Sequence, residues 1–271
     1  MSKYRFLLAR RTTQIMILVL YFGANAYGWK MLAGTLSSST ILGTIPLADP
    51  FAILQMLVAG ATLGADILLG GLIILLFYGL IGGRAFCSWV CPINMVTDSA
   101  NWLRRKLYLD DAERKVWVSR KVRYWVLGLT LIVSAIVGVG AFEFVSPITI
   151  LNRGIVFGFG MSMAVVAVIF LFDLFVLKNG WCGHICPLGG FYSLVGKFAP
   201  LSVMHNQANC TLCMKCKDIC PEKQVLHTIG KKSGKIVDIE CTNCGRCIEV
   251  CEDDALKFTI FDITKDIKGE I

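Results

Sequence analysis

The chain has 271 residues, of which 55% are apolar, and its mean hydropathy is +0.64. This composition is too apolar for a soluble domain of this length and indicates a membrane protein. The formal net charge is +8, but residues 204–271 hold 10 Lys or Arg against 11 Asp or Glu. The positive excess therefore lies in the apolar part of the chain, which argues against nucleic-acid binding.

Four apolar stretches could each cross about 30 Å of hydrocarbon as an α-helix. They cover residues 13–31, 61–83, 124–142 and 154–177. The segments predicted on one side of the membrane carry 13 Lys or Arg, against 2 near the span ends on the other side. The positive-inside rule then predicts a multi-pass protein of the bacterial cytoplasmic membrane with both termini in the cytoplasm.

A basic segment lies between the second and third predicted spans. Residues 97–109, TDSANWLRRKLYL, begin with N-cap candidates and mix Trp102 and leucines with basic residues. We interpret this segment as an amphipathic helix on the cytoplasmic membrane surface. A solvated basic loop that only obeys the charge rule explains the same residues equally well.

The apolar part of the chain contains an internal repeat. A shift of 95 residues aligns two CxxxCP motifs, each preceded by an aromatic residue: Phe86, Cys87, Cys91 and Pro92 match Trp181, Cys182, Cys186 and Pro187. Upstream, Asp49-Pro50 matches Ser146-Pro147. We predict two parallel copies of a helix, an external loop, a second helix and a CxxxCP motif. A pseudo-two-fold axis along the membrane normal would bring the four cysteines together at the cytoplasmic surface.

These four thiols allow several kinds of chemistry. They could bind a third iron–sulfur cluster, form a redox-active disulfide pair, contact the cofactor of a partner, or only pack, and Phe86 and Trp181 would shield the site. His184 in the second motif is a further ligand candidate, although a lone histidine is more often a hydrogen-bonded neighbour. The three histidines, His184, His205 and His227, lie outside the predicted spans, so we expect no haem.

The last third of the chain carries eight cysteines in two runs with the spacing CxxCxxCxxxC. In two-cluster ferredoxins the fourth cysteine of each run binds the other cluster. Cluster one is therefore assigned to Cys210, Cys213, Cys216 and Cys251, and cluster two to Cys241, Cys244, Cys247 and Cys220. Glu252 stands where the second run should have proline. Zinc in paired CxxC knuckles is the competing interpretation, and the two complete runs disfavour it.

The predicted architecture has two parts. Residues 1–203 form an all-α domain of four transmembrane helices, and residues 204–271 form a cytoplasmic α+β ferredoxin domain with two 4Fe–4S clusters. The α+β class follows from a hairpin predicted around Gly230 to Gly234 and from the alternating sequence LKFTIFDI near the end.

Two side chains at predicted membrane depth are candidates for a quinol site. Asp173 lies nine residues before Cys182, about 13 Å along a helix, and Tyr78 is its repeat mate. Both could accept a proton or a hydrogen bond from a quinol hydroxyl, because buried carboxylates in spans are often functional. A structural lock of Asp173 to Arg84 or to the backbone is at least equally plausible.

The strings FCSWVCPINMVTDSANWLRR (86–105) and GWCGHICP (180–187), followed by the two four-cysteine runs, resemble the quinol dehydrogenase membrane subunit of the periplasmic nitrate reductase system. The paired CxxxCP motifs are shared with nitrous-oxide-reductase regulators and cytochrome oxidase assembly ferredoxins. The resemblance implies oxidation of menaquinol or ubiquinol, with electrons passed to a periplasmic four-cluster ferredoxin-like subunit and on to nitrate reductase and its cytochrome subunits. The alternative is a membrane ferredoxin that acts as a reductant in the maturation of another respiratory metalloenzyme.

The predicted external loops, Asp49 to Gln55 and Ser146 to Asn152, are the expected docking surface for that periplasmic partner. Simple helix capping by a polar residue and proline is the alternative explanation of the same residues.

Overall fold

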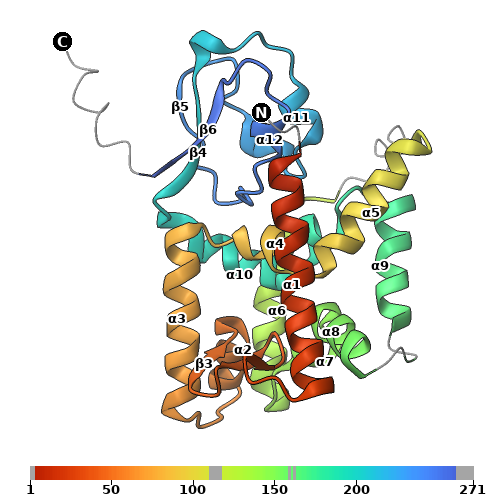
Figure 1. Cartoon of the computed structure of the whole chain (residues 1–271), viewed down its shortest axis with the longest axis vertical. Coiled ribbons are helices and arrows are strands. Elements are labelled where there is room, and N and C mark those ends of the chain that lie inside the picture. The colour runs from red at the N-terminus through yellow and green to blue at the C-terminus, as the bar shows by residue number, and fades with distance from the viewer. Residues whose placement is uncertain (1–3, 110–117, 158–159, 161–162, 261–271) are drawn as a thin grey trace, which may run out of the picture.

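The computed structural model of the protein describes residues 4–109, 118–157, 160 and 163–260. An elongated helical half carries a smaller α+β half at one end (Figure 1). The N-terminal end of the chain lies at that same end, beside the α+β half.

Long helices run roughly along the long axis of the helical half (Figure 1). They are α1 (Arg5–Tyr27), α3 (Ala65–Ile81), α6 (Val122–Val137) and α9 (Ala164–Phe175). Among the described helices, only α1 is both long and apolar enough to cross a membrane by itself. The 17, 16 and 12 residues of α3, α6 and α9 span about 26, 24 and 18 Å. The helical N-terminal region is therefore confirmed, whereas four complete spans remain a prediction.

Two of the helices have bounds that differ from those of the predicted spans, and the spans themselves stay a prediction. The first helix begins at Arg5 rather than near residue 13, so Arg10 and Arg11 lie inside it. The stretch predicted at 154–177 is divided between α8 (Pro147–Phe157) and α9. Glycines at 158 and 160 in the intervening sequence disfavour a continuous helix.

The helical half is not all-α, which corrects the predicted fold class. Between α1 and α3, the strands β1 (Leu32–Gly34), β2 (Ser38–Ile41) and β3 (Ile45–Ala48) form an antiparallel sheet in that order. The short helix α2 (Pro50–Val58) follows and leads into α3. This sheet was not predicted from the sequence, because its strands of three or four residues are too short for a period-two pattern.

The two halves of the predicted repeat have the same order of helices. After α2 and α3 come the first cysteine turn α4 (Ala85–Trp89) and α5 (Ile93–Lys106). After α7 (Ala141–Val145), α8 and α9 come the second cysteine turn η3 (Trp181–Ile185) and α10 (Pro187–Val195). Each set thus has a short helix that begins with proline, a long helix, a cysteine turn and a final helix.

The helix predicted at 97–109 exists, but it begins earlier, at Ile93, and it does not only lie on a surface. α5 packs against α9. Arg104 is fully buried and its Nη1 donates to the carbonyl oxygens of Asp173 (3.3 Å) and Leu174 (3.2 Å). These bonds satisfy carbonyl groups at the end of α9.

The C-terminal half is a small α+β unit. It contains β4 (Leu201–His205), α11 (Lys215–Ile219), β5 (Gly234–Lys235), α12 (Arg246–Glu249) and β6 (Leu256–Ile260), with short 3₁₀ turns η4 (Gly196–Phe198), η5 (Gln207–Asn209) and η6 (Lys223–Leu226). Its antiparallel sheet has the order β5-β4-β6. Strand β4 begins at Leu201, ahead of the domain boundary that the sequence suggested at residue 204. The predicted strand at LKFTIFDI corresponds to β6, and the residues after Ile260 lie outside the described part.

Candidate functional site

The cysteines assigned to cluster two lie around one cavity in the C-terminal half. The cavity has a volume of about 20 Å3 and is lined by Cys220, Cys241, Cys244 and Cys247. Burial raises the pKa of Cys220, and the neighbouring Cys244 and Cys241 raise it further. A residue of the first run therefore lies among three residues of the second run, as the crossed ligation pattern requires.

The other four tail cysteines are also neighbours. Burial raises the pKa of Cys216, a backbone N–H group at Lys217 opposes this, and the nearby Cys251, Cys210 and Cys213 raise it further. The packing of α11 against α12 causes this arrangement. Within the described ranges, no three His, Cys, Asp or Glu side chains are placed to hold one metal ion.

The two CxxxCP turns have the same backbone closure. The N–H group of Cys91 donates to the carbonyl oxygen of Phe86 (3.0 Å), and the N–H group of Cys186 donates to that of Trp181 (2.9 Å). Both bonds join residues five apart, and in the second copy the turn is a π-helix. Such π turns occur frequently at functional sites.

The fold brings the four CxxxCP cysteines together. Cys91 and Cys186 are buried in the core of the helical half, and Cys87 and Cys182 pack against the same core. Burial raises the pKa of Cys182, and the nearby Cys91, Cys186 and Cys87 raise it further. Thiols from both repeats therefore share one site, as the parallel repeat predicts, and a cluster bound there stays a prediction.

This cysteine site adjoins the ferredoxin half. A cavity of about 30 Å3 is lined by Cys87 and Cys182 from the two repeats and by Cys244 from the tail. The hydroxyl of Ser88 donates to the carbonyl oxygen of Thr242 (2.7 Å), next to Cys244. The indole Nε1 of Trp89 donates to the carbonyl oxygen of Asn243 (3.0 Å). The first cysteine turn is thus hydrogen-bonded directly to the loop of the second tail run.

Buried arginines surround these cysteines, and sequence reasoning missed this role. Arg84 and Arg123 are buried and form ion pairs with Glu222 at 2.8 and 3.4 Å, and Arg120 also pairs with Glu222. Arg84 further donates to the carbonyl oxygen of Cys182 (3.4 Å). From the sequence, Arg120 and Arg123 were only topology signals, and Arg84 was in addition a possible partner of Asp173. The missed signal was the position of Arg84 three residues before Cys87 and of Glu222 two residues after Cys220.

The cavity shared by Cys87, Cys182 and Cys244 is also lined by Arg84 and Arg246. The Nε groups of both arginines are buried and have no hydrogen-bond partner within the described part of the chain. Thiolate-bound clusters are anionic, so buried guanidinium groups fit them electrostatically. The donor set and the charge around it therefore suit iron–sulfur centres.

The two candidate quinol residues have structural partners. One carboxylate oxygen of Asp173 accepts a hydrogen bond from the backbone N–H of Trp181 (3.0 Å) and so caps the second cysteine turn. This is the backbone lock, while Arg84 pairs with Glu222 instead. Tyr78 is buried among aromatic rings, with Phe86 and Tyr192 at centroid distances of 5.6 and 5.3 Å.

His184 also lies in the second cysteine turn and is buried. Burial, together with the positive charge of Arg120, lowers the pKa of His184 to about 4. Its imidazole is therefore neutral at physiological pH. Whether His184 is a cluster ligand or a hydrogen-bonded neighbour of the cysteines stays a prediction.

The polar residues at the ends of the predicted docking loops are buried, and docking by these loops stays a prediction. Asp49, Gln55, Ser146 and Asn152 are all buried. Asp49 accepts a hydrogen bond from the N–H of Phe51 (3.2 Å) and caps α2, which begins with Pro50. The side-chain oxygen of Gln55 accepts from the N–H of Phe142 (2.9 Å). The capping explanation therefore fits these residues.

Comparison with protein families independently identifies the repeat and the tail. A 4Fe-4S binding domain matches residues 63–109 and again residues 159–203. A 4Fe-4S dicluster domain matches residues 202–252. The first family thus matches each half of the repeat, and the second matches the two tail runs. No solved structure matches the chain.

Curated relatives cover most of the chain. The methylamine utilization ferredoxin-type protein MauN of Methylorubrum extorquens is 45% identical over 83% of this chain and 78% of its own length. The ferredoxin-type protein NapH of Haemophilus influenzae is 42% identical over 86% of this chain and 81% of its own length, and that of Escherichia coli is 39% identical over 82% and 77%. The chain is an iron–sulfur electron-transfer protein and belongs to the family of ferredoxin-type proteins that includes NapH and MauN.

Proposed function

We propose that this protein takes electrons from quinol in the bacterial cytoplasmic membrane and passes them to a periplasmic ferredoxin-like partner and on to periplasmic nitrate reductase. Oxidation of a quinol to the quinone releases a pair of electrons and a pair of protons. The observation that carries the proposal is the cavity lined by Cys87, Cys182 and Cys244. Because these residues line the same cavity, the cysteines of the helical half lie directly beside a cysteine of the second tail run.

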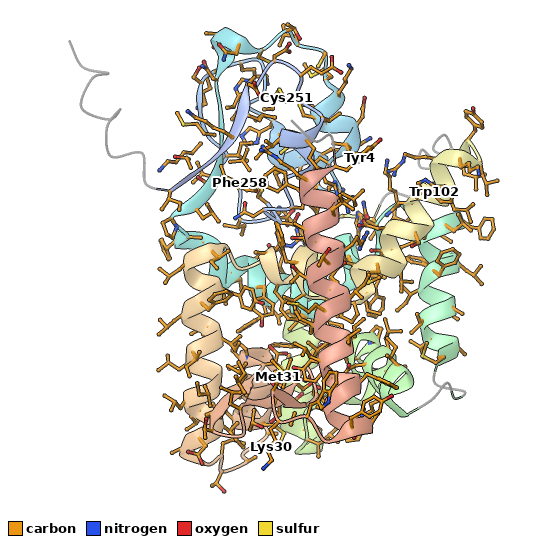
Figure 2. The ribbon with its side chains drawn as sticks, in the orientation of Figure 1. Tyr4, Lys30, Met31, Trp102, Cys251 and Phe258 are labelled. Atoms are coloured by element: carbon orange, nitrogen blue, oxygen red, sulfur yellow. The ribbon has the colours of Figure 1, made fainter. Side chains whose placement is uncertain are left out.

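The arrangement of the chain ends supports a multi-pass topology with both termini on the cytoplasmic side. Tyr4, at the start of α1, lies beside the ferredoxin half, and Lys30 and Met31 lie at the opposite end of that helix (Figure 2). Large apolar side chains such as Leu76, Ile136 and Phe175 are exposed on α3, α6 and α9. Exposed apolar surface of this extent is typical of contact with lipid.

The proposed cofactors are two 4Fe–4S clusters in the tail and a third at the CxxxCP pair. Such a cluster supplies reversible electron transfer when it is bound. The ligands proposed for the third centre are Cys87, Cys91, Cys182 and Cys186. The chain would hold these thiolates through the two matching turns and would offset their negative charge with Arg84.

A chain of aromatic rings supports an outward route for electrons. Phe142 and Phe51 lie near the predicted external side, with ring centroids 5.8 Å apart, and Phe51 lies 5.5 Å from Phe191. Phe191 contacts Tyr192 (5.6 Å), which stacks on Phe86 at 4.8 Å. Because Phe86 precedes Cys87, these contacts link the proposed third centre to the external helices by continuous packing.

A second candidate function is a reductant for the maturation of another respiratory metalloenzyme. Relatives named for methylamine utilization are as similar to this chain as those named NapH. This similarity favours a shared electron-delivery module whose partner differs between systems.

Quinol-dependent reduction distinguishes the two candidates. Anaerobic full-length protein in lipid nanodiscs is mixed with menaquinol or ubiquinol analogues and the ferredoxin-like partner, and cluster reduction is followed by absorbance and electron paramagnetic resonance. The respiratory function predicts reduction by one of the quinols. Clusters that dithionite reduces but that neither quinol reduces, with the partner present, would reject it.

A further inference from the structure

A large pocket lies between α1, α5, α9 and the ferredoxin half, and neither Tyr78 nor Asp173 is among its lining residues. Its volume is about 640 Å3, which is in the range of sites for small organic ligands. The walls are mostly apolar and include Leu7, Trp102 and Phe170. Figure 2 shows Tyr4 at the end of α1 and Trp102 on α5, both residues of this pocket. The two side chains are more than half exposed, so they mark the pocket mouth.

Arg10 lines the inner part of this pocket and is fully buried. None of its three guanidinium nitrogens has a hydrogen-bond partner within the described residues. The nearest carboxylate is that of Asp98 at 3.9 Å, and Asp98 is already bound by Arg11 and Arg246. A buried guanidinium that makes no hydrogen bond, and whose carboxylate partner at 3.9 Å is shared with two other arginines, is incompletely compensated. The site therefore calls for a ligand oxygen that accepts hydrogen bonds from Arg10.

The pocket adjoins the proposed redox site. Arg10 and Arg246 line both the large pocket and the cavity that contains Cys87, Cys182 and Cys244. One helical turn after Arg10, the amide of Gln14 donates to the carbonyl oxygens of Ser88 and Cys91, each at 3.2 Å. A ligand oxygen held by Arg10 would thus lie one side chain away from the cysteine cavity.

The lining of the pocket combines four arginines with two carboxylates, and its apolar walls include two aromatic rings. The carboxylates of Asp98 and Glu249 line it together with the arginines, so a phosphate would meet repulsion as well as attraction. The rings of Trp102 and Phe170 suit a flat apolar ring. Leu8 and Leu171 are exposed. They are next in sequence to the lining residues Leu7 and Phe170, so an apolar surface is available along which a hydrocarbon tail can leave the pocket.

We propose that this pocket binds the quinol head group, with one of its oxygen atoms accepting hydrogen bonds from Arg10. The inference rests on the proposed quinol-linked function and moves the binding site from Tyr78 and Asp173 to the surface between α1 and α5. The ring lies between Trp102 and Phe170, and the tail leaves toward the lipid-facing side of α1 and α9. Asp98 and Arg246 hold α5 and the ferredoxin half together around the ligand.

The test measures binding as well as electron transfer. Full-length protein in nanodiscs is titrated with decylubiquinone and with a short-tail naphthoquinone, and is photolabelled with an azidoquinone. We expect label on peptides that contain residues 4–11 or 99–105. Arg10→Gln should weaken binding of the preferred quinone at least about tenfold, or about 1.4 kcal/mol, and Arg10→Lys should recover part of the loss. Label that is absent from both residues 4–11 and residues 99–105 would overturn the proposal.

A second variant keeps the test independent of the arginine network. Ser99 lines the pocket and is exposed, so Ser99→Trp should fill the space and block quinone binding. Leu107→Trp, at the C-cap of the same helix and outside the pocket, should bind quinone like the unmodified protein. Unchanged tail-cluster resonance spectra in both variants establish that the fold is intact. Normal quinone binding by the Ser99→Trp protein would overturn the site.

The outcomes also separate this site from the function on which it rests. If quinol reduces the clusters of the unmodified protein and of Ser99→Trp alike, the site is wrong and the function stands. If quinol reduces neither, while dithionite reduces both, the function is wrong. Nanodiscs with and without phosphatidylglycerol test the lipid alternative. If only the anionic lipid displaces or replaces the ligand in the pocket, the pocket binds a lipid phosphate, and the quinol site is overturned.

Discussion

The guanidinium of Arg84 lies 2.8 Å from the carboxylate of Glu222, and both side chains are almost completely buried. Arg84 precedes the first CxxxCP motif, and Glu222 follows Cys220 of the tail. One ion pair therefore connects the helical half to the loop that is proposed to hold the second tail cluster.

Loss of this ion pair should detach the two halves. Glu222→Gln leaves Arg84 buried without its carboxylate and leaves Arg123 only with Glu240 at 3.7 Å, and removing one member of a buried pair destabilises by about 3–5 kcal/mol. We expect a lower melting temperature and faster protease cleavage between the halves. Glu252→Gln is the control, because the pair between Glu252 and Lys215 is exposed and its loss should change stability by less than about 1 kcal/mol. Equal melting temperatures for the two variants would contradict this role.

The four CxxxCP cysteines should bind iron in addition to the iron that the tail clusters hold. With three cubanes the full chain holds about 12 iron and about 12 sulfide, and Cys182→Ser should reduce each to about 8. The tail resonances should persist while quinol-dependent reduction stops. Iron and sulfide analysis of the anaerobically reconstituted protein checks the numbers. An unmodified protein that binds only about 8 iron would exclude the third cluster.

A backbone contact between the two repeats makes Gly83 irreplaceable. A Cβ atom on Gly83 would lie 1.7 Å from the carbonyl oxygen of Tyr192 and 2.6 Å from the nitrogen of Gly196. Gly83→Ala therefore forces the end of α3 away from α10, and we expect a loss of stability of about 3 kcal/mol or more.

Gly79→Ala is the matched control, since nothing lies within 4 Å of that position in the same helix. Alanine is the better helix former there by up to about 1 kcal/mol, so stability should be unchanged or slightly higher. Thermal unfolding in one detergent compares the two variants. A Gly83→Ala protein as stable as the Gly79→Ala protein would refute the close contact.

The stability of the docked halves should fall in acid through Asp98. Burial alone would raise the pKa of Asp98, but Arg246, Arg11 and Arg10 together hold it below its usual value. A carboxylate with a lowered folded-state pKa stabilises the fold above the unfolded value of about 3.9, and that contribution disappears as the pH falls through the folded-state pKa. Asp98→Asn should therefore lower the melting temperature near neutral pH.

The same comparison at about pH 3 should give a smaller difference between Asp98→Asn and the unmodified protein, because the carboxyl group begins to take up its proton there. Both proteins are measured without clusters, so that acid loss of iron does not enter the comparison. A difference that stays constant from about pH 7 to about pH 3 would show that the charge of Asp98 contributes nothing.

Several features of the site could not be predicted from the sequence. Arg10, Arg84 and Arg123 satisfy the positive-inside pattern, and their spacing says nothing about burial. Asp173 had two interpretations from the sequence; the structure adds the bond from the N–H of Trp181 to one carboxylate oxygen, and the role at a quinol site stays a prediction. The sheet of β1, β2 and β3 forms from strands too short to carry a periodic signal.

The sequence by itself determined the chemistry of this protein: which cysteines are ligand candidates, how they pair between the tail runs, and that the CxxxCP motifs belong to two copies of one unit. This information is local, because ligand spacing and repeat landmarks are properties of short segments. Only the tertiary structure decided that Cys244 lines one cavity with Cys87 and Cys182 and that buried arginines surround them. It also decided that Arg10 lines a pocket beside α5. Such contacts join residues far apart in the chain, and they depend on how helices pack and where charges are desolvated, which no short pattern specifies.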